Sequence, residues 1–126
     1  MTEAYRLRML LYKRLPANRT AESKSVLDLA GETLLAVAIY RTARHGQSFG
    51  NPPEDETNKT VAACRKAIRF YESRRSAEPE NVHYVLKKVE GHTLLTETYS
   101  KSENYNEALN TAAQVIDLLE SLPEAV

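Results

Sequence analysis

The sequence has few of the residues that covalent crosslinks, metal sites or phosphate loops require. Its 126 residues include one cysteine, Cys64, three histidines, four glycines and no tryptophan. A single thiol cannot form an intrachain disulfide, and without a second thiol nearby it gives no zinc motif. Four scattered glycines exclude a glycine-rich phosphate loop. We therefore expect a cytoplasmic protein that folds on an apolar core and needs neither a cofactor nor a metal.

Long apolar runs and an excess of one charge are also missing. The run from Leu34 to Tyr40 falls well short of the ~20 residues that a membrane helix needs. The 17 Lys and Arg residues balance 17 Asp and Glu residues, which argues against a dedicated nucleic-acid binder. Residues 1–75 nevertheless hold 14 basic and 8 acidic residues, whereas residues 76–126 hold 3 and 9. These opposite signs favour either neutralisation within the fold or head-to-tail association between copies.

What the sequence does contain is helical periodicity, which predicts one all-α domain, residues 1–126, of about five helices. The first helix is expected over residues 3–15. A first helical hairpin is expected over 21–75, with a loop at 47–55, and a second over 79–121. The residues predicted to face the core are Val26, Ala30, Leu34, Val37 and Ala38; Val61, Cys64, Ile68 and Tyr71; Val82, Val85, Val89, Leu95 and Tyr99; and Ala108, Ala112, Val115, Leu119 and Leu122.

A short sequence match, which we call the sequence echo, links the two hairpins. Gly31-Glu32-Thr33-Leu34-Leu35 matches Gly91-His92-Thr93-Leu94-Leu95 at an offset of 60 residues. At an offset of 48, Ile68, Glu72 and Ser73 match Ile116, Glu120 and Ser121. The difference between the two offsets corresponds to a longer loop in the first hairpin. Such matches favour a duplicated hairpin, although five-residue echoes also arise by chance in helical sequences.

The second hairpin resembles a known repeat family. Over residues 91–123 the chain is similar to a tetratricopeptide repeat, and the residues that carry the likeness are Leu95, Tyr99, Tyr105, Ala108 and Pro123. The departures from the family pattern are His92 in place of Trp, Thr96 in place of Gly, and Val115 in place of Ala. The resemblance implies antiparallel helical hairpins that bind a protein or peptide. A generic four- or five-helix bundle fits the same periodicity.

The resemblance also implies which residues would bind a partner. The first helix of each hairpin would line an inner groove, and the residues expected there are Thr33, Val37, Tyr40 and Arg41 from one hairpin and Glu90, Thr93, Glu97 and Lys101 from the other. We expect a non-enzymatic adaptor or scaffold. Two hairpins leave an apolar face open at each end, so the helix at 3–15 is expected to cap one end. A second copy, as in a homodimer, or a tightly bound partner is expected to cover the other end.

Two other functions remain open at this stage. A basic set could follow a phosphate backbone, although few aromatic residues accompany it and a solvated helix face fits the same pattern. The residues of this set are Arg65, Lys66, Arg69, Arg74 and Arg75. A small inhibitor or immunity protein that blocks one enzyme surface is the second alternative.

The sequence offers no set of residues suited to catalysis. His45, His83 and His92 lack the i, i+4 spacing that places two imidazoles on one metal. Cys64 falls in a predicted buried stripe, where a thiol is protonated and inert. Glu54 and Asp55 fall at a predicted helix start, where the helix dipole accounts for them. We therefore expect no enzymatic activity.

Overall fold

The computed structural model describes residues 3, 6 and 21–123, and residues 21–123 fold into four α-helices without a strand. The helices are α2 (Ala21–Gly46), α3 (Glu54–Ala77), α4 (Val82–Lys101) and α5 (Tyr105–Glu120). The all-α fold class is thus confirmed. The fifth helix, predicted over residues 3–15, falls outside the described residues except at Glu3 and Arg6. None of the described helices is long and apolar enough to cross a bilayer.

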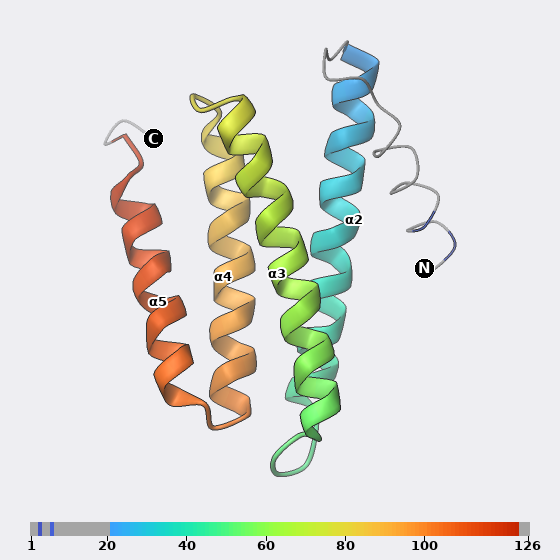
Figure 1. Cartoon of the computed structure of the whole chain (residues 1–126), viewed down its shortest axis with the longest axis vertical. Helices are drawn as coiled ribbons and strands as arrows, with labels where there is room; N and C mark the ends of the chain where they lie inside the picture. The colour runs from blue at the N-terminus through green and yellow to red at the C-terminus, as the bar shows by residue number, and fades with distance from the viewer. Residues whose placement is uncertain (1–2, 4–5, 7–20, 124–126) are drawn as a thin grey trace.

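Successive helices run antiparallel and lie side by side in the order α2, α3, α4, α5 (Figure 1). Helix α3 packs against both α2 and α4, and α2 also contacts α4. Among the described helices, α5 packs against α4 alone. The array therefore has two ends, with α2 at one and α5 at the other.

The ends of α3 are set by charge and by proline. Pro53 precedes the first helical residue, and three acidic residues, Glu54 to Glu56, occupy the first turn. They face the positive end of the helix dipole, while Arg74 and Arg75 lie in the last turn near its negative end. The helix start predicted at Pro53 is confirmed. The loop is shorter than the predicted 47–55, because Glu54 and Asp55 are already helical.

The start of α4 differs from the prediction. The helix begins at Val82 rather than at Pro79, because the Asn81 side chain supplies the cap. Its Oδ1 accepts a hydrogen bond of 3.0 Å from the backbone N–H of His83. At the other end of α4, Glu103 in the connection to α5 adopts a left-handed backbone with φ of 62°.

Two clusters of buried side chains form the core. One joins α2 to α3 and to the start of α4; its members are Leu27, Ala30, Leu34, Leu35, Ala67, Phe70, Tyr71 and Tyr84. The other joins all four helices; its members are Ala38, Cys64, Ile68, Leu95, Tyr99 and Ala108. Most of the predicted inward residues are therefore buried or half-buried. The prediction is wrong for Leu119, which is 46% exposed, because α5 turns Thr111 and Leu118 inward instead.

The glycines of the sequence echo lie where α3 approaches its two neighbours. A Cβ at Gly31 would lie 2.6 Å from Cε1 of Phe70 and 2.7 Å from the hydroxyl of Tyr71, both on α3. A Cβ at Gly91 would lie 2.6 Å from Cγ1 of Ile68, also on α3. The two matching glycines thus both lie against α3, one from each side.

This packing predicts that Gly31→Ala destabilises the fold even though alanine favours helix. The added methyl gains about 1 kcal/mol of helix propensity, but it meets two buried aromatic rings that have little room to move. We expect the free energy of unfolding in urea to fall by about 1–2 kcal/mol. Gly46→Ala is the control, because nothing lies within 4 Å of its Cβ, and stability there should be unchanged or slightly higher. Equal behaviour of the two variants would contradict the packing.

Candidate functional site

A groove runs between α2 and α3. It encloses about 540 Å³. Its lining from α2 is Leu34, Val37, Tyr40, Arg41 and Arg44, and its lining from α3 is Glu56, Lys59, Thr60, Ala62, Ala63 and Lys66. Among the described residues, none from α4 or α5 contributes to the lining. We call this hollow the α2–α3 groove.

The groove exists because small side chains from α3 face larger ones from α2. Thr60, Ala62 and Ala63 project little from their helix, so the two backbones leave space above the buried side chain of Leu34. Val37 is half-buried and Tyr40 is 55% exposed. The floor and one wall of the groove are thus apolar and accessible.

The rim of the α2–α3 groove is predominantly basic. Four cationic side chains, Arg41, Arg44, Lys59 and Lys66, outnumber the one acidic residue, Glu56. The hydroxyl of Tyr40 accepts a hydrogen bond of 3.3 Å from Arg44 Nη1. Lys59 Nζ lies 3.1 Å from a carboxylate oxygen of Asp55, which offsets part of the positive charge. The residues that line the groove therefore carry a net positive charge.

The structure separates the residues that were predicted to line one groove. Val37, Tyr40 and Arg41 lie in the α2–α3 groove, whereas Thr33 is 5% exposed and donates a hydrogen bond to the carbonyl of Leu29. The four residues predicted on α4 do not line it. Of these, Glu90, Thr93 and Glu97 are exposed and Lys101 is half-buried.

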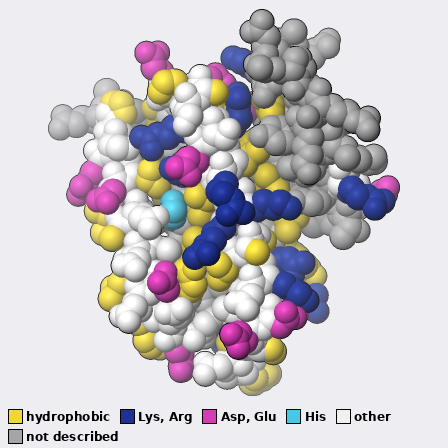
Figure 2. All heavy atoms as spheres, viewed as in Figure 1, with side chains coloured by type: hydrophobic (Ala, Val, Ile, Leu, Met, Phe, Trp, Pro, Cys, Tyr) yellow, Lys and Arg dark blue, Asp and Glu magenta, His cyan; other side chains and the backbone are white. Residues whose placement is uncertain are grey.

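The predicted basic patch is likewise divided. Arg65 and Arg69 line a second hollow of about 400 Å³ between α3, α4 and α5, and Lys66 lines the α2–α3 groove. Figure 2 shows basic side chains gathered near the centre of this face, with apolar side chains and a histidine beside them. Arg74 is 5% exposed and Arg75 is half-buried. These residues do not form one continuous exposed stripe.

His92 lies at the second hollow, and it is 8% exposed. Its Nδ1 has no hydrogen-bond partner among the described residues. Burial lowers the pKa of the His92 imidazole, the nearby charge of Lys88 lowers it further, and Glu72 acts in the opposite direction. Glu107 lines the same hollow as Arg65 and Arg69, so its local charge is mixed.

A second buried histidine, His45, links three helices near the C-terminal end of α4. His45 Nε2 is 2.9 Å from the Thr57 hydroxyl and 3.3 Å from the Ser102 hydroxyl. Burial lowers the pKa of His45, Lys101 lowers it further, and Glu56 opposes them. The side chain thus ties together the end of α2, the start of α3 and the end of α4.

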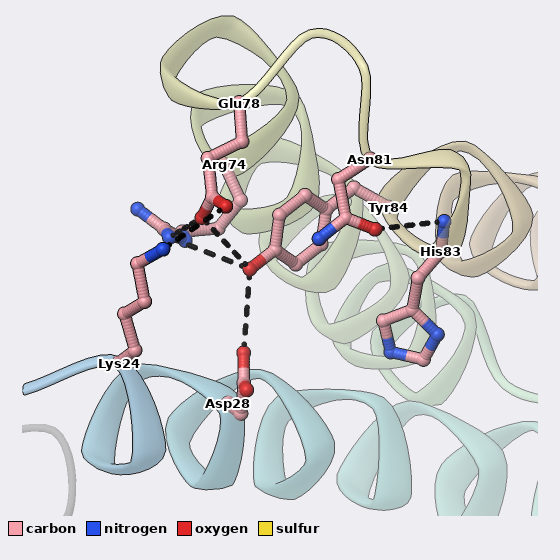
Figure 3. A network of polar contacts seen from close by, with 7 residues as sticks. All are labelled: Lys24, Asp28, Arg74, Glu78, Asn81, His83 and Tyr84. Atoms are coloured by element: carbon pink, nitrogen blue, oxygen red, sulfur yellow. Dashed lines mark hydrogen bonds and ion pairs between the residues drawn. The ribbon is translucent and has the colours of Figure 1, made fainter. Parts of the chain in front are cut away.

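A polar network that the sequence did not reveal joins α2, α3 and α4 (Figure 3). Arg74 Nη2 donates to Glu78 Oε2 at 2.5 Å, and the Tyr84 hydroxyl lies 3.4 Å from Asp28 Oδ1. Lys24 Nζ approaches the same Glu78 carboxylate at 3.4 Å. The partners come from positions up to 56 residues apart, so no local spacing announces them.

The described residues offer little that could act chemically. Cys64 is fully buried, and burial raises the pKa of its thiol, as the sequence predicted. Its Sγ lies 3.5 Å from the Thr42 hydroxyl. Among residues 21–123, no three His, Cys, Asp or Glu side chains cluster in a way that could hold a metal ion.

The two buried histidines predict a loss of stability in mild acid. In the folded protein the pKa of His45 and of His92 lies below the usual 6.5, so the unfolded chain binds more protons as the pH falls through that value. Stability is therefore full above about pH 6.5 and declines below it. We expect the Tm to fall on the order of 5 °C between pH 7.5 and 5.5.

The control for this prediction is a comparison of histidine variants. His45→Gln combined with His92→Gln should flatten the dependence of Tm on pH, whereas His83→Gln, at an exposed position, should preserve it. A pH dependence that survives the double substitution would assign the effect to other groups.

The network in Figure 3 predicts that the carboxylate of Glu78 contributes more to the stability of the fold than the exposed side chain of Lys24. Glu78→Gln leaves the 5% exposed Arg74 without its counter-charge, and we expect a loss of about 2 kcal/mol in the free energy of unfolding. Lys24→Gln removes an exposed partner and should cost less than about 0.5 kcal/mol. Chemical denaturation of both variants checks the difference, and equal losses would argue against a buried ion pair as the centre of the network.

The comparisons with known proteins add no relative to this description. No family model, curated protein sequence or solved structure matches the chain. The functional argument accordingly rests on the grooves, their charges and the packing of the four helices.

Proposed function

We propose that this protein is a non-enzymatic scaffold that binds a partner protein through the α2–α3 groove. The observation that carries the proposal is an apolar groove with a predominantly basic rim. A helix or peptide with an apolar face would cover Val37, Ala62 and Ala63, and each large apolar side chain buried there would contribute about 1.5–3 kcal/mol before the cost of association is subtracted. Acidic residues beside that face would meet Arg41 and Arg44.

We further propose that the four helices form two tetratricopeptide-like hairpins. Support comes from the antiparallel order, from the contact between α2 and α4, and from the family-like residues of the second hairpin. In such an arrangement α2 and α4 would line a shared inner face, where exposed Glu90 and Glu97 offer a second surface of opposite charge. The lone buried thiol of Cys64 is consistent with the cytoplasmic location that we propose.

A crosslinking experiment tests the proposed groove directly. A photoreactive phenylalanine analogue at position 62, which is exposed on the groove wall, should form protein adducts when the purified chain is illuminated in cell extract. The same analogue at Ser73, an exposed position of α3 outside the groove lining, is the matched control. Combining position 62 with Arg41→Glu and Arg44→Glu should lower the adduct yield about tenfold, because two favourable charges become repulsive.

The chemistry of the adducts separates this proposal from its alternatives. Protein adducts specific to position 62 support a protein-binding scaffold. Adducts that disappear with ribonuclease would instead indicate a nucleic-acid-associated protein. Capture of one enzyme together with loss of that enzyme's activity would indicate an inhibitor. Equal labelling at positions 62 and 73, or no labelling at either, would contradict the proposed groove.

A further inference from the structure

The outer face of α5 is apolar and uncovered in the part of the chain that the structure describes. Tyr105, Leu109, Ile116 and Leu119 are 60%, 70%, 55% and 46% exposed. Their spacing of four, seven and three residues places them along one side of the helix. We call these four residues the α5 stripe. Since α5 contacts α4 alone among the described helices, the stripe has no neighbour within this part of the chain.

Helices α2 and α5 lie at opposite ends of the helical array (Figure 1), so the α5 stripe is remote from the groove between α2 and α3. The groove extends from Leu34 to Arg44 along α2, which is ten residue steps or about 15 Å of helix. Three of the four stripe residues, from Leu109 to Leu119, also span ten steps. The groove is therefore long enough to take these three side chains at once, with Tyr105 beyond its end.

The charges of the two surfaces are complementary. Asp117 and Glu120 lie on α5 one and four residues after Ile116, and Glu103 precedes Tyr105. Between Glu78 and Pro123 the chain holds eight acidic residues against three lysines. The groove, by contrast, carries four basic residues against Glu56. Opposite potentials of this kind favour association and fix its direction.

Charge also argues against other possible occupants of the α2–α3 groove. Residues 1–20 carry five basic residues and only Glu3, so they match the basic rim poorly. Two α5 stripes placed face to face would bring acidic residues together, and two grooves would bring basic residues together. A symmetric dimer through either surface is therefore disfavoured relative to pairing of one stripe with one groove.

We infer that a second copy of this chain docks its α5 stripe into the α2–α3 groove. The inference rests on the proposed function, because it names the first partner of the same groove. Pairing of two different surfaces is heterologous, so each added copy leaves one stripe and one groove open at the ends of the assembly. Copies would then associate head to tail into short chains whose length increases with concentration. A contact of about one helix length predicts association in the micromolar range.

The test uses two variants of the full chain, one with the α5 stripe disabled and one with the α2–α3 groove disabled. We call them the end variants, because the two surfaces form the two ends of each copy in the assembly. Leu109→Glu with Ile116→Glu places charges on exposed positions of the stripe, and Arg41→Glu with Arg44→Glu reverses the groove rim. Ser73→Glu, on an exposed position outside both surfaces, is the control. Circular dichroism establishes that each variant folds, and sedimentation velocity measures mass from ~1 to ~200 µM, a range that brackets micromolar dissociation constants.

The expected masses follow from the geometry of the two ends. Wild type and Ser73→Glu should rise with concentration from 14.2 kDa to multiples of it, while each end variant alone remains at 14.2 kDa. An equimolar mixture of the two end variants should form a dimer and grow no further, because each supplies one intact surface. A chain that carries all four substitutions lacks both surfaces, so it should remain a monomer at every concentration.

Other outcomes overturn the inference without ambiguity. The inference is overturned if the mass of the wild type stays at 14.2 kDa throughout the concentration range. It is also overturned if a mixture of the two end variants fails to form a dimer. Self-association that both end variants retain would place the contact elsewhere. If the wild type stays monomeric while position 62 still crosslinks to a different protein, the self-docking inference fails and the proposed scaffold function stands.

Discussion

The close approach of α3 to its two neighbours is the constraint on which the rest of this structure depends. Gly31 on α2 and Gly91 on α4 leave no room for a Cβ against Phe70, Tyr71 and Ile68. With α3 held from both sides, α2 and α4 also come into contact, and the buried side chains form two adjoining clusters. The groove follows from the same arrangement, because the outer sides of α2 and α3 carry residues that these contacts do not cover.

Polar contacts fix the two ends of this packed unit. The Arg74 network joins α2, α3 and α4 at one end, and His45 joins the same three helices at the other. Helix α5 takes part in neither and rests on α4 alone among the described helices. Its apolar outer face is flanked by acidic residues, whereas the rim of the α2–α3 groove is predominantly basic.

Patterns among residues close together in the sequence predicted those features of the fold that depend on short-range interactions. The all-α class, the helix start after Pro53 and the burial of Cys64 followed from periodicity, charge at helix ends and turn residues. Burial of Leu119 was predicted wrongly, because the angle at which α5 rests on α4 decides between adjacent stripes on the same helix. The predicted partner-binding residues fell on separate surfaces, since helical spacing gives a face but not the neighbour it meets. The Arg74 network was missed because its residues meet only in three dimensions.

Methyl NMR spectra recorded during dilution test most directly the proposal that the α2–α3 groove accepts the α5 stripe of another copy. We expect the methyl signals of Ala62 and Ala63 in the groove and of Leu109 and Ile116 in the stripe to shift together with concentration. Signals of buried Leu27 and Ala67 should stay constant. Spectra that do not change with concentration, or shifts confined to one of the two surfaces, would contradict it.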